Sequence, residues 1–316
     1  MRFTTTLVMA VILSLGLAAS ALAQGTGRSL DIQPGARQNG FGAAGVALGD
    51  DATGVTWWNP AGLGYVTTSA AELSYAQLVP GLATDVSYNY ATYVTPLSGW
   101  GAIGFGLVFL SYGESDQTDA LGNILGKFGS NEVSPAVYLG TKVLPDLAVG
   151  ASLKFIRIQL APKEQSGVGS TIGFDLGALY KIPSAGLRFG VNLQNLGPSV
   201  TFLSDDTKSP LSRNLKMGVA WEAAKSGQFR FMAVGDFNQS FVTTDYRTYN
   251  GGMELKYTDQ IAGRIGYYSD PLGQIGGLTY GVGFGVGNLA IDFGSIPQAK
   301  DSGLPNVSKI TLGYRF

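Results

Sequence analysis

The sequence predicts an all-β protein, an antiparallel transmembrane β-barrel of about 14 strands with an N-terminal plug in its lumen. Hydrophobic residues make up 45% of the chain and charged residues only 14%, against about 25% charged in a soluble domain. Apolar residues alternate with glycine or polar residues along most of the chain, which is typical of strands with two unlike faces. No apolar run of 18 or more residues follows residue 24, so no transmembrane helix is expected there.

Residues 1–23 have the pattern of a secretory signal peptide. Arg2 supplies a short positive region, residues 7–19 are apolar, and Ala21-Leu22-Ala23 forms a small-residue cleavage site. We therefore expect cleavage after Ala23, export, and localisation in an outer membrane.

Residues 24–70 do not alternate and are rich in glycine and alanine. A barrel of this size has a lumen wider than its own side chains fill, because about eight strands is the filled limit. We expect this stretch to be a plug, or hatch, inside the barrel. Its bulky residues Phe41, Trp57 and Trp58 either line a hydrophobic ligand pocket or anchor the plug, and the sequence leaves both possibilities open.

Residues 71–316 are predicted to form the barrel itself. Many of the expected strands have the roughly 9–11 residues that cross a bilayer obliquely. They are 71–78, 84–95, 99–112, 131–144, 146–160, 168–181, 186–196, 213–223, 228–239, 246–258, 259–269, 276–287, 288–296 and 305–316.

The predicted connections alternate between short turns and longer loops, as in outer-membrane barrels. The short turns fall at 96–98, 145, 183–185, 225–227, 259 and 287–288. The longer loops fall at 113–130, 161–167, 197–212, 240–245, 270–275 and 297–304. Both ends of the barrel domain are then expected on the periplasmic side.

Charges of both signs recur at positions predicted to face the lumen. We interpret them as a salt-bridged network that holds the plug, rather than as a catalytic acid–base pair. The network residues are Lys154, Asp175, Arg188, Lys216, Glu222, Arg230, Asp236, Glu254, Arg264 and Asp292.

The composition argues against enzymatic chemistry. The chain contains no cysteine and no histidine, which removes thiolate catalysis, Ser-His-Asp triads and most zinc sites. The net charge of −1 provides no basic surface for nucleic acid. We expect no catalytic residue, no metal and no cofactor.

The last strand ends on an aromatic residue. Ile310, Leu312, Tyr314 and Phe316 share one face, and Phe316 is the final residue. This pattern resembles the C-terminal signal that the barrel-assembly machinery recognises, with Tyr314 and Phe316 as its aromatic members.

Three stretches of the N-terminal region, 35–47, 50–52 and 58–63, resemble the signature of PorV/PorQ-type proteins, which are relatives of the FadL channel. The run Asn192-Leu193-Gln194-Asn195-Leu196-Gly197-Pro198 is similar to a recurrent internal motif of that group. The resemblance implies that Asn59, Pro60 and Ala61 are the hatch motif, acting as a structural turn or as a ligand contact.

The resemblance also implies a function. It favours a part in type IX secretion, in which the protein binds the C-terminal domains of exported cargo. The alternative is a FadL-like channel for hydrophobic small molecules such as long-chain fatty acids. Both functions place the protein in contact with outer-membrane lipid.

Overall fold

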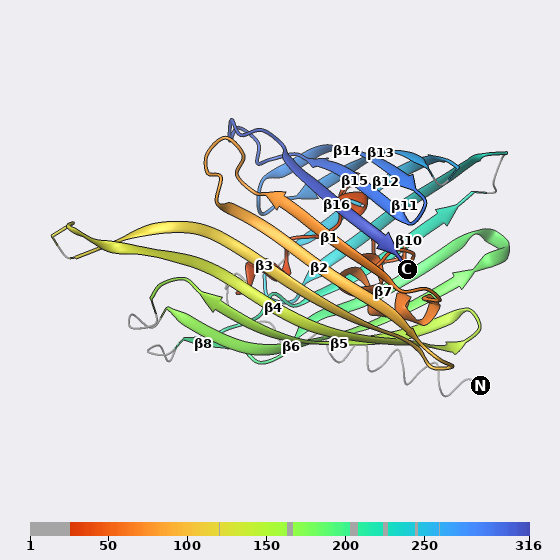
Figure 1. Cartoon of the computed structure of the whole chain (residues 1–316), viewed down its shortest axis with the longest axis horizontal. Coiled ribbons are helices and arrows are strands. Elements are labelled where there is room, and N and C mark those ends of the chain that lie inside the picture. The colour runs from red at the N-terminus through yellow and green to blue at the C-terminus, as the bar shows by residue number, and fades with distance from the viewer. Residues whose placement is uncertain are drawn as a thin grey trace.

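The computed structural model describes residues 26–119, 121–162, 167–202, 208–223, 227–243, 246–258 and 260–316. The predicted signal peptide and its cleavage site lie outside the described residues. The described chain folds into a single sheet of 16 strands, of which β8 and β9 are short additions. Each of the remaining 14 strands pairs antiparallel with its neighbours in chain order, and β1 pairs with β16 to close the barrel (Figure 1).

The predicted strands match the observed ones to within a few residues, with the exceptions given below, which confirms the predicted fold class. The barrel strands are β1 Ala70–Gln77, β2 Val86–Leu97, β3 Gly101–Thr118, β4 Ile124–Leu144, β5 Leu147–Gln159, β6 Val168–Ile182, β7 Leu187–Leu196, β10 Asn214–Glu222, β11 Phe229–Ser240, β12 Arg247–Tyr257, β13 Ile261–Asp270, β14 Ile275–Val286, β15 Leu289–Ile296 and β16 Val307–Arg315.

The prediction of a loop at 113–130 is wrong. There β3 and β4 continue to pair past the other strands, so that they form a long projecting hairpin (Figure 1). Its ladder is irregular after Ser111, and Gly113 has a positive φ of 83°. Residues 114–118 are all polar, so hydrophobic alternation could not reveal this extension.

The predicted loop 197–212 also contains strands. They are β8 Val200–Phe202 and β9 Lys208–Ser209. β8 pairs with β6, and the side chain of Val200 is fully buried. This connection therefore packs onto the barrel wall instead of extending away from it.

The two faces of the barrel wall differ in polarity. On β6, Phe174 is 42% exposed on the outside, whereas its neighbour Asp175 is fully buried inside. The same alternation along the other strands places large exposed apolar side chains on the outer face. Such a surface is stable against hydrocarbon rather than water. Among the described residues, no helix has the length and hydropathy needed to cross a membrane.

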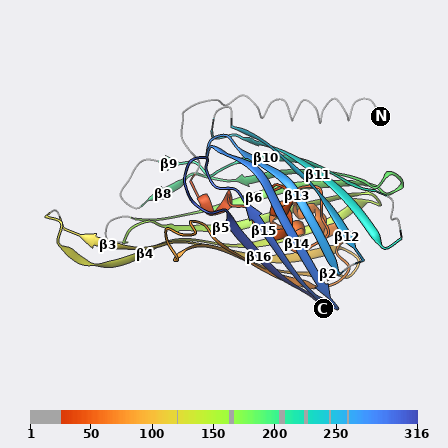
Figure 2. The same cartoon turned by 90° about the horizontal axis from the view of Figure 1, so that it is seen from above.

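Residues 26–66, here called the N-terminal segment, lie against the inner face of the barrel (Figure 2). The segment contains η1 Arg28–Leu30, α2 Ala36–Gly40, η2 Gly54–Trp58 and η3 Pro60–Tyr65. Helix α2 packs on β13 to β16, while η3 packs on β3 to β6. The segment therefore contacts opposite sides of the barrel.

Inward-facing glycines allow the segment backbone to approach the wall. A Cβ atom added at Gly150 would collide with the Pro60 carbonyl, and one at Gly190 would collide with the Val46 carbonyl. Glycine at these positions thus permits close backbone contact. This explains part of the high glycine content, since many of these residues accommodate the segment rather than enlarge an empty lumen.

Candidate functional site

The side chain of Asn59 ties the N-terminal segment together and joins it to the wall. Its Nδ2 atom donates to the carbonyl oxygens of Val46 and Ala178, each at 3.0 Å. Its Oδ1 atom accepts from the backbone N–H of Ala61 at 3.1 Å, which caps η3, and Pro60 occupies the first position of that helix. Because Asn59, Pro60 and Ala61 are all buried, this geometry supports the structural-turn interpretation of the motif.

Trp57 and Trp58 lie in the middle of the barrel and are each 1% exposed. Their rings pack edge to face with centroids 5.0 Å apart. Wall side chains bind their backbone: Gln194 donates to the Trp57 carbonyl at 2.7 Å, and Asn192 donates to the Trp58 carbonyl at 2.8 Å. Both tryptophans therefore anchor the segment in this closed arrangement.

One region of the lumen near the long loops is apolar and aromatic. A buried cluster there combines Trp57 and Trp58 with inward-facing residues of four strands. The wall members are Tyr88, Tyr90, Val108, Leu110, Tyr268 and Ile296. The hydroxyl of Tyr90 donates to Thr56 Oγ1 at 2.8 Å, so the segment closes against this lining. Phe41 belongs to a separate buried cluster with Leu48 and Met232.

The predicted lumen charges form two groups, one deep inside the barrel and one at the short-turn end. Deep in the wall, Lys154 pairs with Asp175 at 2.8 Å, and Asp236 accepts from the backbone N–H groups of Gly45 and Val46 at 2.7 and 3.1 Å. Lys216 lies over the ring of Trp57, with its Nζ atom 4.3 Å from the ring centroid. Asp236 and Lys216 therefore contact the segment from the wall side, whereas Lys154 and Asp175 pair within the wall.

The remaining predicted charges pair across strands at the short-turn end. Arg188 binds Glu222 at 2.7 Å, and Arg230 lies 3.6 Å from the same carboxylate. Glu254 binds Arg264 at 2.7 Å, and Arg264 also binds Asp292. The structure thus places all ten predicted network residues on the inner face, in two separate groups.

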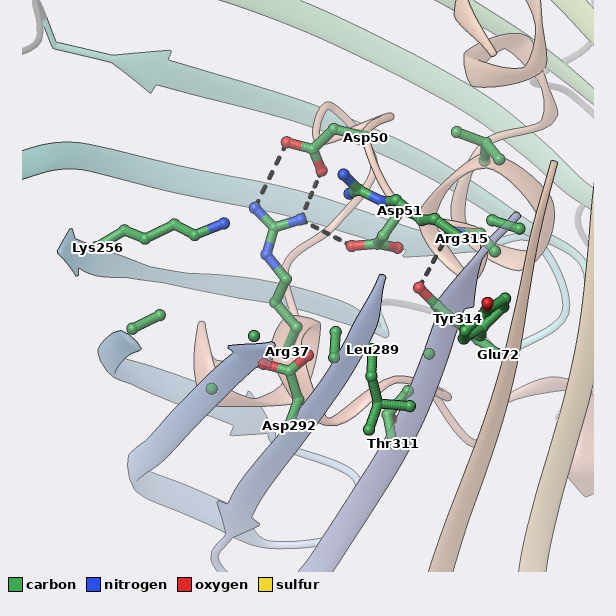
Figure 3. A pocket seen from close by; sticks show the side chains of 18 of the residues that line it. Arg37, Asp50, Asp51, Glu72, Lys256, Leu289, Asp292, Thr311, Tyr314 and Arg315 are labelled. Carbon is green, nitrogen blue, oxygen red and sulfur yellow. Dashed lines mark hydrogen bonds and ion pairs between the residues drawn. The ribbon is translucent and has the colours of Figure 1, made fainter. Parts of the chain in front are cut away.

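Two charges of the N-terminal segment join the separate ion pairs at the short-turn end (Figure 3). Arg37 binds Asp50 at 2.6 Å and Asp51 at 2.8 Å, and its Nε atom lies 3.4 Å from Glu254. Asp50 in turn lies 3.1 Å from Arg188. One chain of ion pairs, here called the mouth network, therefore runs from Asp292 through the segment to Glu222.

A cavity of about 630 Å³ lies beside the mouth network and is lined by the segment, the short turns and the starts of strands β1 and β15. Glu72 of β1 faces it and accepts hydrogen bonds from the backbone N–H groups of Ala52 and Thr53 at 3.2 and 2.9 Å. The lining carries both signs of charge. The lumen is therefore charged at the short-turn end, and an apolar and aromatic cluster lines part of it near the long loops.

The two adjacent carboxyl groups of the segment respond differently to this setting. Burial tends to raise the pKa of Asp50, but the Arg37 and Arg188 guanidiniums outweigh it and hold that pKa well below its usual range. Burial raises the pKa of Asp51 despite Arg37, and the charge of Asp50 adds to the rise. Asp50 is therefore the more firmly ionised member of the pair.

Tyr314 and Phe316 lie on the outer face at the end of β16. They are 44% and 65% exposed, and the Phe316 ring packs edge to face against Tyr93 at 5.9 Å. The backbone N–H of Phe316 donates to the Ser69 carbonyl at 2.9 Å, which ties the chain end to the start of β1. The part of both residues in assembly remains a prediction.

Several residues at this site have no counterpart among the predicted site residues. They are Arg37, Glu72, Asn192, Gln194 and Lys309, whose Nζ atom donates to Asn39 Oδ1 at 3.2 Å. Four of them lie at inward-facing strand positions, so the alternation could have identified them. Arg37 lies in the non-alternating segment, where no such signal exists.

A closed 14-stranded barrel is a form shared with solved outer-membrane channels. No family model matches the chain, and no curated protein matches its sequence. Structural similarity, in contrast, extends along most of the chain.

One similar structure is the toluene transporter TbuX of Ralstonia pickettii, at 15% identity and a TM-score of 0.60, covering 89% of this chain and 98% of that one. A second is the monoaromatic hydrocarbon channel CymD, at 15% identity and a TM-score of 0.59, covering 90% and 97%. A third is a FadL homologue of Pseudomonas aeruginosa, at 14% identity and a TM-score of 0.53, covering 90% and 99%. At these identities the similarity establishes the fold.

Proposed function

We propose that this protein is an outer-membrane channel for hydrophobic small molecules, in which the N-terminal segment is the plug. The observation that carries the proposal is the apolar and aromatic cluster that lines part of the lumen near the long loops. A water-filled porin has a polar interior, whereas tyrosine, valine and leucine side chains face inward here. Two of the similar structures are a toluene transporter and a monoaromatic hydrocarbon channel, which supports the same class of solute.

In this proposal, the solute enters from the long-loop end and binds between the plug and the aromatic wall. Burial of its apolar surface against Tyr88, Tyr90 and Leu110 supplies the favourable free energy. The plug then rearranges so that the solute passes toward the polar cavity at the short-turn end. The chemistry is binding and passage, with no covalent step.

The same proposal assigns the long-loop end to the outside of the cell and the short-turn end to the periplasm. The exposed apolar band would then contact outer-membrane lipid. We further propose that the barrel-assembly machinery recognises Tyr314 and Phe316. Removal of Phe316 should leave little folded barrel in the membrane, and normal amounts would contradict this role.

The tryptophans offer a direct test of the channel proposal. Of the four, Trp57 and Trp58 lie in the lumen, while Trp100 and Trp221 are exposed on the outer face. A double variant Trp100→Phe/Trp221→Phe keeps only the lumen tryptophans as fluorophores. We expect toluene or an alkane to change their emission with a saturable dependence, and glucose to leave it unchanged.

The matched control is Trp57→Phe/Trp58→Phe, which keeps only the outer tryptophans. It should show the non-saturable response of solute partitioning into detergent. A saturable response of equal size in this control, or none in the lumen-only variant, would contradict the proposal. Heat-modifiable migration on gels verifies that both variants are folded.

A part in type IX secretion is the second candidate, and the projecting β3–β4 hairpin favours it. Leu121, Ile124 and Leu125 near the tip are 88%, 67% and 63% exposed, which suits contact with another protein. The resemblance to PorV/PorQ-type proteins supports the same function. Capture of cargo C-terminal domains by the purified barrel would test it.

A further inference from the structure

The outer face of the barrel has a groove of about 360 Å³ along strand β2, between β1 and β3. On one side it is lined by Leu73 and Tyr75 of β1, with Ile310 and Leu312 of β16 behind them, and on the other by Leu107 and Phe109 of β3. These six side chains are 39–60% exposed, so the groove faces away from the lumen. Figure 1 shows these three strands side by side, next to β16.

The groove exists because two small side chains follow each other on the outer face of β2. Asn89 pairs in register with Tyr75 and Phe109, and Ala91 pairs with Leu73 and Leu107. Each small residue is therefore flanked by two bulky ones. Because neighbouring strands are about 4.8 Å apart, the two walls stand roughly 10 Å apart, which leaves a channel one strand wide.

The groove is closed at one end and open at the other. Toward the short turns, the next outward residue of β2 is Tyr93, which packs against Phe316. Toward the long loops, the next outward residue is Ser87, whose small side chain leaves the groove open. An elongated ligand would therefore enter with its tail pointing toward the short turns.

The open end carries polar groups, because Ser87 pairs there in register with Gln77 of β1 and Ser111 of β3. The Nδ2 atom of Asn89 lies 3.5 Å from Ser87 Oγ, which is the outer limit of a hydrogen bond. Among the described residues, the Asn89 side chain has no other hydrogen-bond partner. An amide without partners in an apolar medium costs free energy, so a ligand with a polar group at this depth would be favoured.

We propose that this groove binds one acyl chain of an outer-leaflet lipid, with a carbonyl or hydroxyl group of that lipid hydrogen-bonded to Asn89. The assignment to the outer leaflet rests on the orientation given under the proposed function. The narrow channel between two ridges fits a single chain, whereas the convex face of a second barrel could not enter it. The lipid is thus a structural ligand, separate from any solute in the lumen.

Two variants test the site, and one variant is a control. Ala91→Phe fills the groove, and Asn89→Leu removes the amide while keeping the number of side-chain heavy atoms and their branching. Gly263→Phe adds the same ring as Ala91→Phe to the outer face of β13, where an added Cβ meets no atom within 4 Å. The barrels are extracted in detergent, washed, and their bound lipid is counted per barrel by mass spectrometry.

We expect wild type and Gly263→Phe to retain one lipid more than Ala91→Phe. Asn89→Leu should lose this lipid at least severalfold faster during washing. Equal retention by Ala91→Phe and wild type would contradict the proposal, and so would a wild-type dimer that Ala91→Phe converts to a monomer, because a second copy would then fill the groove. The fluorescence response of the lumen tryptophans should be the same in all four proteins, so failure of the channel proposal is detected separately.

Discussion

At the scale of single residues, Asn59 joins three backbone groups of the plug and the wall. Asn59→Ala leaves the carbonyls of Val46 and Ala178 buried without this donor, at a cost of about 1–3 kcal/mol for each group. We expect faster proteolysis of the N-terminal segment and a lower midpoint of thermal unfolding. Asn123→Ala, at the exposed tip of the β3–β4 hairpin, is the control and should change neither measurement.

Gly150 tests the close approach between plug and wall. Gly150→Ala adds a methyl group where the Pro60 carbonyl already lies, so η3 must move away from β5. We expect increased ion conductance in planar bilayers, because the displaced plug no longer seals this side. Gly263→Ala adds the same methyl group on the outer face, where it has room. Equal conductance of the two variants would show that the plug does not depend on this contact.

At the scale of secondary-structure elements, the β3–β4 hairpin separates the two candidate functions. Replacing residues 113–130 by a tight turn leaves the ladder from Leu110 and Glu132 onward intact. Under the channel proposal, the shortened barrel should fold and still show the saturable solute response. Loss of that response in the folded variant would contradict the channel proposal, whereas cargo binding that wild type shows and the variant lacks would support the secretion function.

The mouth network binds the N-terminal segment at the short-turn end, and its pH dependence follows from Asp50. Because the pKa of Asp50 is lowered in the fold, its ion pairs stabilise the docked plug above the unfolded pKa of about 4. That contribution is lost only as the pH falls through the lower folded value. We expect wild-type conductance to stay low from pH 8 to about pH 4, whereas Asp50→Asn should conduct more at pH 7. Opening of wild type near pH 6 would contradict this assignment.

At the scale of the whole molecule, the barrel separates a lipid-facing surface from a charged and aromatic interior. Phe174→Arg places a cation against hydrocarbon near the middle of β6, at a cost of about 2–4 kcal/mol. We expect a lower midpoint in urea unfolding and less heat-modifiable protein. Phe128→Arg, on the projecting hairpin, is the control and should unfold like wild type. Equal stability of both variants would place the outer face of β6 away from lipid.

The alternation of apolar and small residues was sufficient to locate the 14 barrel strands and both faces of the wall. This was possible because side chains in a strand alternate between two faces, and here the two faces meet different media. The alternation also identified Asp175, Arg188 and Glu254 as inward charges. It failed at residues 114–118, because a hairpin outside the apolar band has no apolar face to reveal it.

The pairing of those charges depends on contacts that no local pattern contains. Arg37 reaches Glu254, 217 positions away, only because closure of the barrel brings β12 next to α2. The groove on β2 likewise arises from the register of three strands, which sets Asn89 and Ala91 between four bulky side chains. Periodicity acts along one strand, whereas the plug contacts, the mouth network and the groove depend on which strands become neighbours when the sheet closes.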